Sequence, residues 1–497
     1  MRVNVCCKLG GLVATTVSVF VLAASAQIPD GARLPYSGDL LVARAIANGL
    51  MQRPARSAPS FLSRSPKITC SPAPCVLPNT QVSPLPDTTP RNETPIVVMP
   101  GNSNIMLAGA NDYNCDTVTG FFTTTDGGST WTEQCLGAAP SHSGAGDPGV
   151  AIDLAGHQYT TGVQFNSGGG TDIVMEKDFG APAVAVPAFF PGGSADKDWL
   201  QADVNPTSPH KNNLYISVTQ FDASSNSEIT VSTSTDGGVT FTTVAVDALQ
   251  TYPTVDQFSD IAVGRHGAVY VSWMRCVAKG PTGDCGGTKA TLLMSKSTDG
   301  GTTWSAESTI AKVTLAPDKC GAFYGCLPHT NERVSNIPVI AIDNSTGPSS
   351  GHLYAGFYNW NGTYMVEEVA RSASGGTSWF APVRVTPTSD KSDQFFNWLE
   401  VSSDGALEVA WLDRRDDPLN ISYEAFSSIS TNGGTKFQAN KKLSSALSNP
   451  TNDGFGGSFM GDYTGSAWVG EKLYFTYCDT SNGSSCQDEL VGYFDAP

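Results

Sequence analysis

Residues 297–304 read Ser-Thr-Asp-Gly-Gly-Thr-Thr-Trp, and this stretch recurs along the chain. A second full copy occupies residues 124–131, and residues 234–241 repeat it with Phe in place of the final Trp. Weaker copies, with Ser or Asn where the Asp stands, occupy residues 372–379 and 430–437. Copies of one short pattern at long, similar intervals predict a fold built from structural repeats.

The chemistry of this stretch suits a tight turn between two strands. An Asp or Asn side chain accepts hydrogen bonds from backbone N–H groups two or more residues further on, and a Gly pair takes positive φ without a Cβ clash. The final aromatic residue then begins the next strand. We therefore expect the acid of each copy to organise its own turn.

The composition fits an all-β protein. The chain has 51 Gly, and short apolar strands alternate with turns while helical periodicity is scarce. The formal net charge of -17 argues against nucleic acid and anionic membrane surfaces as partners.

The repeated stretch resembles the Asp-box (BNR) repeat of the sialidase-like β-propeller superfamily, from about residue 92 to the C-terminus. The resemblance implies four-stranded antiparallel blades, with the Asp-box on the turn between the third and fourth strands and away from the catalytic face. The repeat that identifies the fold is therefore expected to be structural.

We count similar units from residue 92 onward and favour seven blades, with six blades, as in known sialidases, as the alternative. The last unit lacks an outer strand. The segment 77–84 is predicted to supply this strand, which would close the ring and remove open sheet edges. The units span about 92–140, 147–192, 196–250, 256–316, 331–388, 393–446 and 456–497.

The N-terminal region is expected to lie outside the propeller. Residues 1–26 have a basic start, an apolar run and a small-residue cleavage site, so they are predicted to be a secretory signal peptide. Residues 27–66 contain one candidate amphipathic helix and are interpreted as a leader or mobile arm outside the core. The propeller is assigned to residues 67–497, with no membrane span and a secreted location.

Ten cysteines remain after the signal peptide and form five local couples. An even number in an exported chain favours disulfides, and the spacings do not suit zinc. The couples are Cys70/Cys75, Cys115/Cys135, Cys276/Cys285, Cys320/Cys326 and Cys478/Cys486.

Candidate catalytic residues come from loops expected to line the funnel of the propeller. The resemblance implies a Tyr nucleophile and an Asp acid/base. Asp112 lies where the acid/base is expected, and Tyr463 with the adjacent Asp462 is a candidate nucleophile. Asp413 belongs to the densest charge cluster, residues 413–417, which also suits Ca²⁺.

Candidate substrate-binding residues are three arginines and two tryptophans. Known sialidases hold the substrate carboxylate with Arg, and the position that matches the first such Arg is Glu93 here. A carboxylate there would repel a sialic acid. The candidates for binding an anionic or neutral sugar are Arg275, Arg333, Arg415, Trp199 and Trp360.

The sequence therefore favours a secreted propeller of the sialidase superfamily that acts on extracellular glycans by hydrolysis or lyase chemistry. A non-catalytic propeller that binds glycan or protein is the alternative, and a true exo-α-sialidase is the minority alternative because of Glu93. We lean towards an enzyme, expect a monomer with a carbohydrate partner, and expect no cofactor apart from Ca²⁺ as an option.

Overall fold

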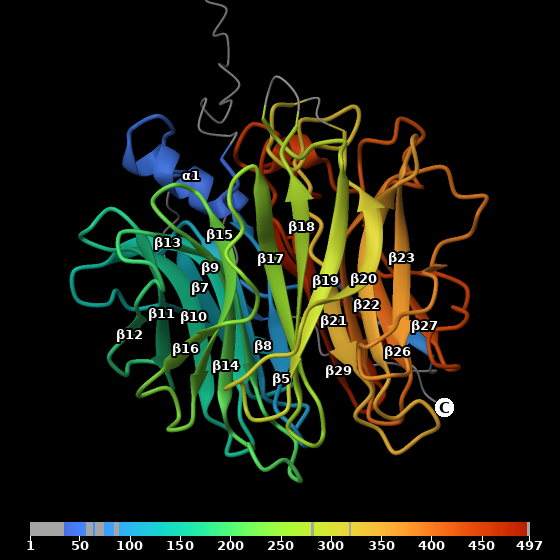
Figure 1. Cartoon of the computed structure of the whole chain (residues 1–497). Coiled ribbons are helices and arrows are strands. Elements are labelled where there is room, and N and C mark those ends of the chain that lie inside the picture. The colour runs from blue at the N-terminus through green and yellow to red at the C-terminus, as the bar shows by residue number, and fades with distance from the viewer. Residues whose placement is uncertain are drawn as a thin grey trace, which may run out of the picture.

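The computed structural model describes residues 34–55, 63–64, 74–83, 89–279, 283–317 and 320–494, and these residues form an all-β molecule (Figure 1). Within them, α1 (Gly38–Ala47) is the one α-helix, and a short 3-10 helix spans Pro450–Asn452. The predicted signal peptide, residues 1–26, lies outside the described residues. No helix in the described ranges is long and apolar enough to cross a membrane.

Antiparallel sheets follow one another along the chain, and short N-terminal strands join the outer edges of the first and last sheets. The first contains β1 (Ser63–Arg64), β4 (Arg91–Asn92), β5 (Ile96–Val98), β6 (Met106–Asp112), β7 (Thr119–Thr124) and β8 (Thr130–Cys135). An eight-stranded sheet follows, made of β9 (Ser143–Ile152), β10 (Gln158–Phe165), β11 (Thr171–Lys177), β12 (Val184–Val186), β13 (Ser194–Ala202), β14 (Leu214–Phe221), β15 (Ser227–Ser234) and β16 (Thr242–Ala245).

The remaining sheets repeat the same order. One contains β17 (Thr254–Val263), β18 (Val269–Val277), β19 (Lys289–Ser297) and β20 (Ser308–Thr314). The next contains β21 (Val339–Ile342), β22 (Leu353–Trp360), β23 (Met365–Ser372) and β24 (Val383–Arg384). The last two contain β25 (Gln394–Val401), β26 (Leu407–Asp413), β27 (Glu424–Ser430) and β28 (Lys441–Lys442), and then β29 (Gly465–Val469), β30 (Lys472–Asp479) and β31 (Gln487–Phe494).

The innermost strands close into a ring. In chain order, β5, β9, β13, β17, β21, β25 and β29 each contact the next, and β29 contacts β5. The eight-stranded sheet is two four-stranded antiparallel units joined by a single parallel residue pair, Thr171 with Ser194. This ring of twisted sheets around a central channel is the arrangement of a β-propeller.

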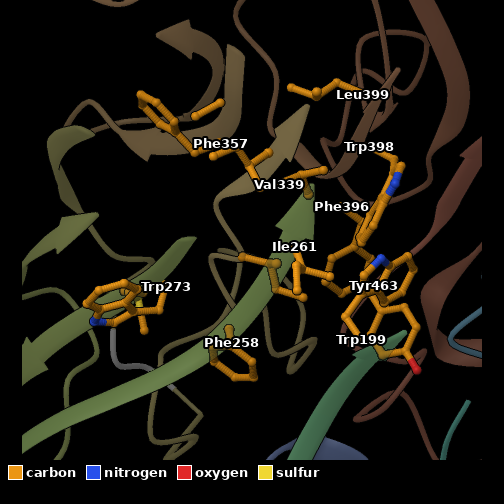
Figure 2. Packing of buried hydrophobic residues seen from close by; sticks show 14 of the residues in the cluster. Trp199, Phe258, Ile261, Trp273, Val339, Phe357, Phe396, Trp398, Leu399 and Tyr463 are labelled. Atoms are coloured by element: carbon orange, nitrogen blue, oxygen red, sulfur yellow. The ribbon is translucent and has the colours of Figure 1, made fainter. Parts of the chain in front are cut away.

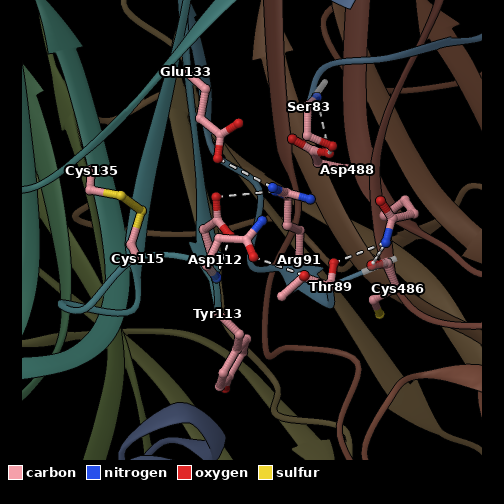
Figure 3. Close-up of polar contacts among 12 residues, drawn as sticks. Ser83, Thr89, Arg91, Asp112, Tyr113, Cys115, Glu133, Cys135, Cys486 and Asp488 are labelled. Carbon is pink, nitrogen blue, oxygen red and sulfur yellow. Dashed lines mark hydrogen bonds and ion pairs between the residues drawn. A yellow bond between two sulfur atoms is a disulfide. The ribbon is translucent and has the colours of Figure 1, made fainter. Parts of the chain in front are cut away.

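The N-terminal chain completes the last sheet. β2 (Cys75–Val76) and β3 (Thr80–Gln81) pair antiparallel with β31, so the segment predicted to close the ring does supply its outer edge. Just beyond β3, the backbone N–H of Val82 donates to the backbone carbonyl of Asp488. The Ser83 hydroxyl donates to the side-chain carboxylate of Asp488 (Figure 3). Val82 is fully buried. The first and last parts of the chain therefore share one sheet.

The recurrent turns have the geometry predicted from their sequence. In the turn at residues 297–304, Asp299 accepts the backbone N–H of Thr303 at 2.9 Å, and its other oxygen accepts the Thr303 hydroxyl. Gly300 and Gly301 take φ values of 72° and 85°. The turns at Asp126 and Asp236 repeat these bonds. The turn is thus a local device, held by a side chain that bonds to its own backbone.

These bonds lead to a pH prediction for Asp299. The Thr303 hydroxyl and backbone N–H lower its pKa from 3.8 to about 2, so the turn is stabilised above the unfolded-state pKa and loses that stabilisation as the pH falls through about 2. We expect Asp299→Ala to melt below the wild type at neutral pH, with the difference shrinking between about pH 4 and pH 2. Thermal melts over this pH range measure it, and a constant difference would contradict it.

Four of the five predicted disulfides are present. They join Cys115 to Cys135, Cys276 to Cys285, Cys320 to Cys326, and Cys478 to Cys486. The fifth couple includes Cys70, which lies outside the described residues. Each observed bridge is local in sequence, as predicted.

The largest difference from the sequence-based expectation concerns residues 27–66. The described part of this segment does not lie outside the core: α1 lies against one end of the sheets (Figure 1), and seven of its ten residues are buried. Leu40, Leu41 and Val42 point in several directions around the helix yet are 0%, 5% and 0% exposed. A helix that is apolar on nearly every side needs burial on nearly every side, which a free arm does not provide. We call residues 34–47 the plug.

Candidate functional site

The inner strands carry a repeated backbone irregularity at the end that faces the plug. Residues with positive φ occur there in successive units, namely Glu93, Asp147, Lys197, Phe258 and Phe396, with φ between 43° and 63°. Bulges in β9, β13, β17 and β25 interrupt the pairing at these points. Non-glycine residues adopt this conformation at a cost of roughly 1–3 kcal/mol, and such strain clusters at functional sites. Each bulge redirects side chains at the end of the channel that faces the plug, which we call the mouth.

Four buried carboxylates gather at this mouth, and we call them the acidic socket: Glu93, Asp147, Asp196 and Asp462. Their exposures are 0%, 0%, 0% and 1%. Glu93 accepts the backbone N–H of Asp462 at 2.9 Å and the amide of Asn111 at 2.8 Å, so residues far apart in sequence are tied together.

The plug inserts the N-terminus of α1 into the acidic socket. The backbone N–H of Ser37 donates to Asp196 at 2.7 Å, and that of Gly38 donates to Asp462 at 2.6 Å. The Ser37 hydroxyl, which also caps the helix, donates to Asp147 at 3.0 Å. A helix N-terminus carries unpaired N–H groups and partial positive charge, so it is complementary to anions.

Asp39 of α1 brings a further acid into the same place. One oxygen from each of Asp39, Glu93 and Asp147 lies within 4.8 Å of the others, and all three side chains are fully buried. We call these three residues the carboxylate trio. At an effective dielectric of about 20, two ionised carboxylates at such a distance repel by roughly 3–4 kcal/mol. The trio therefore cannot be fully ionised without a compensating positive charge.

Burial and mutual repulsion change the acidity of the trio. Burial, with the charge of Asp196, raises the pKa of Asp147 to about 8. Burial raises the pKa of Glu93 well above its usual range, and the charges of Asp147 and Asp39 raise it further. Burial and the charge of Asp147 do the same for Asp39. Burial and repulsion therefore favour the protonated form of each acid in the trio.

Two buried cations lie near these acids among the described residues, and one of them, Arg333, makes an ion pair. Arg333 contacts Asp462 at 2.9 Å with its guanidinium 3% exposed. Lys197 is fully buried, and burial lowers its pKa. Its ammonium group lies 4.6 Å from the ring centre of Trp199 and 4.7 Å from that of Tyr463.

Trp199, Trp398 and Tyr463 pack together as an aromatic layer (Figure 2), and the charges of Glu93 and Asp147 act on Tyr463. The rings of Trp199 and Trp398 are 4.3 Å apart, and Tyr463 meets Trp199 edge-on at 5.6 Å. The Tyr463 hydroxyl donates to the carbonyl of Pro148 at 2.8 Å. Burial raises the pKa of Tyr463 well above its usual value, so this hydroxyl stays protonated.

Beyond the aromatic layer the channel widens into a cavity of about 560 Å³, lined by Trp199, Trp398 and residues later in the inner strands. A second pair of acids lies there. Burial raises the pKa of Glu400 to about 8 and that of Asp260 to about 6. The channel therefore offers acids at both ends, but the end at the plug is covered.

The structure brings together four of the residues proposed from the sequence. Asp462, Tyr463, Arg333 and Trp199 all belong to the mouth or to the layer beneath it. Asp462 accepts Arg333, the Ser335 hydroxyl at 2.6 Å and the N–H of Gly38. These four residues form one connected set, although none is exposed while the plug is in place.

The other proposed residues lie elsewhere, and the charged ones form separate ion pairs. Asp112 contacts Arg91 at 3.2 Å (Figure 3). Asp413 accepts Arg415 and the indole N–H of Trp411. Trp360 ends β22 and packs against the hydrophobic core. Within the run at residues 413–417, Arg415 pairs with Asp413, whereas Arg414 pairs with Asp393 and Asp416 pairs with Lys442.

Arg275, Arg333 and Arg415 have separate carboxylate partners, so the structure gives no sign of one shared anion clamp. Arg275 makes two bonds of 2.7 Å to Asp256 and a further contact of 3.2 Å with Asp247. Paired in this way, an arginine serves to neutralise buried acids of its own sheet.

This pairing leads to a prediction for Arg275. Arg275→Met leaves Asp256 and Asp247 without their cation, and we expect a loss of about 2 kcal/mol in unfolding free energy, below the roughly 3–5 kcal/mol of a fully buried pair. Carbohydrate binding should not change. Chemical denaturation with Lys312→Met, an exposed lysine of β20, as the surface control measures the first effect. Equal stabilities would show that the ion pair is not structural.

Sequence reasoning missed the contribution of the plug and misjudged one acid. Ser37 and Asp39 were assigned to a leader, although the nearly continuous apolar run after Asp39 signals a buried helix. Glu93 was considered only as a replacement for an arginine. Asp147, Asp196 and Asp462 stand just before or at the start of the apolar stretch of their units, and this shared register is the sequence signal that groups them.

Comparisons with known proteins give only distant likenesses. The chain matches no protein-family model and no curated protein sequence. Among solved structures it resembles a protein of unknown function from Dyadobacter fermentans, with 11% identity and a TM-score of 0.45 over 86% of this chain and 100% of that one. It also resembles an α-L-arabinanase from Penicillium chrysogenum complexed with arabinobiose, with 11% identity and a TM-score of 0.43 over 72% and 96%. A third is a Hadza microbial sialidase, with 10% identity and a TM-score of 0.43 over 78% and 73%. The propeller assignment therefore rests on the closed ring itself.

Proposed function

We propose that this chain is a secreted β-propeller enzyme of seven blades that acts on an extracellular carbohydrate, by glycoside hydrolysis or lyase chemistry, at the mouth occupied by the plug. In this proposal the described form is latent, because no substrate can reach the acidic socket while residues 34–47 cover it. A displaced plug would expose the acids above the aromatic layer.

The observation that carries the proposal is the convergence of the acids. Glu93 and Asp147 place carboxyl oxygens within 4.8 Å of each other, and retaining glycosidases likewise act through a close pair of carboxyl groups. Burial and mutual repulsion raise the pKa of both acids, which suits a protonated donor. Lys197 and Arg333 border them, and an aromatic surface for a sugar ring lies beneath.

Seven blades are proposed because each inner strand of the ring begins one four-stranded antiparallel unit, with the N-terminal strands completing the last. The four disulfides support an extracellular location. A true exo-α-sialidase is not favoured, because Glu93 and its neighbours make the mouth strongly anionic.

A non-catalytic propeller that binds glycan or protein remains the second candidate, and the full burial of the acidic socket favours it. In that case the acids exist to hold the plug. The cavity at the far end, with Trp199, Trp398, Asp260 and Glu400, would then be the carbohydrate-binding end.

One set of variants distinguishes these functions. The wild type and a plug-released variant are assayed on a panel of glycans and reporter sugars, and Glu93→Gln and Asp147→Asn are added to the released form. The proposal expects activity on release that falls by roughly 10²-fold or more with either change, the scale of a lost general acid or base. Activity abolished only by Glu400→Gln would move the site to the far cavity, and binding without turnover would favour the second candidate.

A further inference from the structure

We propose that the carboxylate trio, Asp39, Glu93 and Asp147, binds a hard divalent cation, calcium first, which links the plug to the ring. The inference goes beyond the proposed function and does not depend on it, because the site can serve an enzyme or a binding protein equally.

The positions of the oxygens carry the proposal. The three ligand oxygens lie within 4.8 Å of one another, so all can reach a single ion at the about 2.4 Å typical of calcium. The three side chains come from α1, from the segment before β5 and from β9, and each is fully buried. A cation here would therefore bridge three separate segments.

Two of these oxygens have no other partner. Within the described ranges, Asp39 Oδ2 and Asp147 Oδ1 are buried and receive no hydrogen bond. A Cβ added to Gly146, the residue before Asp147, would lie 2.1 Å from Asp39 Oδ2, so this oxygen lies close to the backbone that carries Asp147. Buried carboxylate oxygens without donors are costly unless a charge compensates them.

The neighbouring positive groups are directed elsewhere. The N–H groups of Ser37 and Gly38 are used by Asp196 and Asp462, and Arg333 also pairs with Asp462. Lys197 donates to the carbonyls of Asp198 and Ser259. The charged and titratable groups that face the trio are Asp196, Asp198, Asp462, Lys197 and Tyr113. Acids outnumber bases among them, so a divalent cation reduces the excess of negative charge.

The donor chemistry indicates the class of ion. Carboxylate oxygens, with the amide oxygen of Asn111 beside the backbone N–H of Asp147, are ligands for hard cations. Calcium accepts many protein oxygens in irregular geometry, whereas magnesium retains several waters. A buried, crowded site of this kind is better suited to calcium.

The test uses the full mature chain, treated with a chelator and then dialysed. Calorimetric titration with calcium is expected to give one saturable site per chain. Because calcium affinity follows the charge of its ligands, Asp39→Asn, Glu93→Gln and Asp147→Asn should each weaken binding by more than about tenfold. Glu471→Gln, at an exposed acid in the turn between β29 and β30, is the matched control and should bind like the wild type.

Terbium provides a second readout that needs no substrate. The Tyr113 hydroxyl lies 3.4 Å from Asp39 Oδ1, so terbium at the trio should luminesce when aromatic rings are excited, and calcium should displace it. Calcium should also raise the melting temperature of the wild type and of Glu471→Gln, but not of Asp147→Asn. Failure of the wild type to bind calcium, magnesium or manganese saturably, or binding that all three trio variants retain, would overturn the proposal.

Discussion

Gly38→Ala is expected to release the plug and to raise carbohydrate turnover by at least about tenfold, because each 1.4 kcal/mol of lost docking energy increases the open population about tenfold. A Cβ at Gly38 would lie 2.3 Å from the Phe459 ring and 3.2 Å from the Arg333 guanidinium. Phe459 is fully buried against Phe455 and Val42, so it cannot move aside. Alanine favours a helix over glycine by only about 1 kcal/mol, so the clash should outweigh this gain and the substitution should weaken the docking of the plug.

Limited trypsin digestion measures the release directly, since Arg44 and Arg53 become accessible when α1 leaves. At present Arg44 donates to Ser194 at 3.0 Å, and Arg53 donates to the carbonyls of Tyr113 and Cys115. Ala47→Gly, the opposite exchange at the exposed last residue of α1, is the control and should leave digestion nearly unchanged. Unaltered digestion of Gly38→Ala would show that the plug tolerates the clash, and faster digestion without turnover would exclude a latent enzyme at the mouth.

Val82→Asp is expected to lower the unfolding free energy by at least about 4 kcal/mol, because it places an unpaired charge in a closed apolar cluster. Val82 is 0% exposed and packs with Leu77 and Leu490 where the N-terminal chain meets β31. Loss of this contact removes the outer edge of the last sheet, so the whole ring should be affected.

Val76→Asp is the matched control for ring closure. It lies on β2 of the same sheet, but Val76 is 42% exposed, so the charge remains in water and should cost less than about 0.5 kcal/mol. Calorimetry and chemical denaturation of both variants measure the difference. Equal melting temperatures for the two variants would contradict a role for residues 75–83 in holding the ring together.

The local parts of the fold were predictable because their causes are local. Each recurrent turn is organised by its own acid and glycines, as Asp299 shows, and each observed disulfide joins cysteines close in sequence. The pairing of the 77–84 segment with β31 was also predicted, from its likeness to other outer strands. The turns and the disulfides need no knowledge of distant residues.

The site was only partly predictable, because its chemistry comes from distant segments. Asp462 and Arg333 were proposed separately, and only the folded ring shows that they contact each other. Arg415 was proposed for an anion, but its local acids Asp413 and Asp390 already neutralise it. Asp39 is buried beside Glu93 and Asp147, and nothing in the sequence indicates that these two acids lie next to α1. Periodicity predicts a helix, but it does not indicate what the helix covers.

The pairing of the N-terminal chain with β31 also determines the order of assembly. Ser83 bonds to a residue 405 positions later, so this contact cannot form until both segments have been synthesised. Contacts of such long range form late in folding. The intermediate sheets can assemble first. The channel then stays accessible to water and ions until residues 75–83 pair with β31. We therefore expect the plug to cover a mouth that is already in contact with water and ions. The ions that the folded protein encloses would then depend on the compartment in which folding is completed.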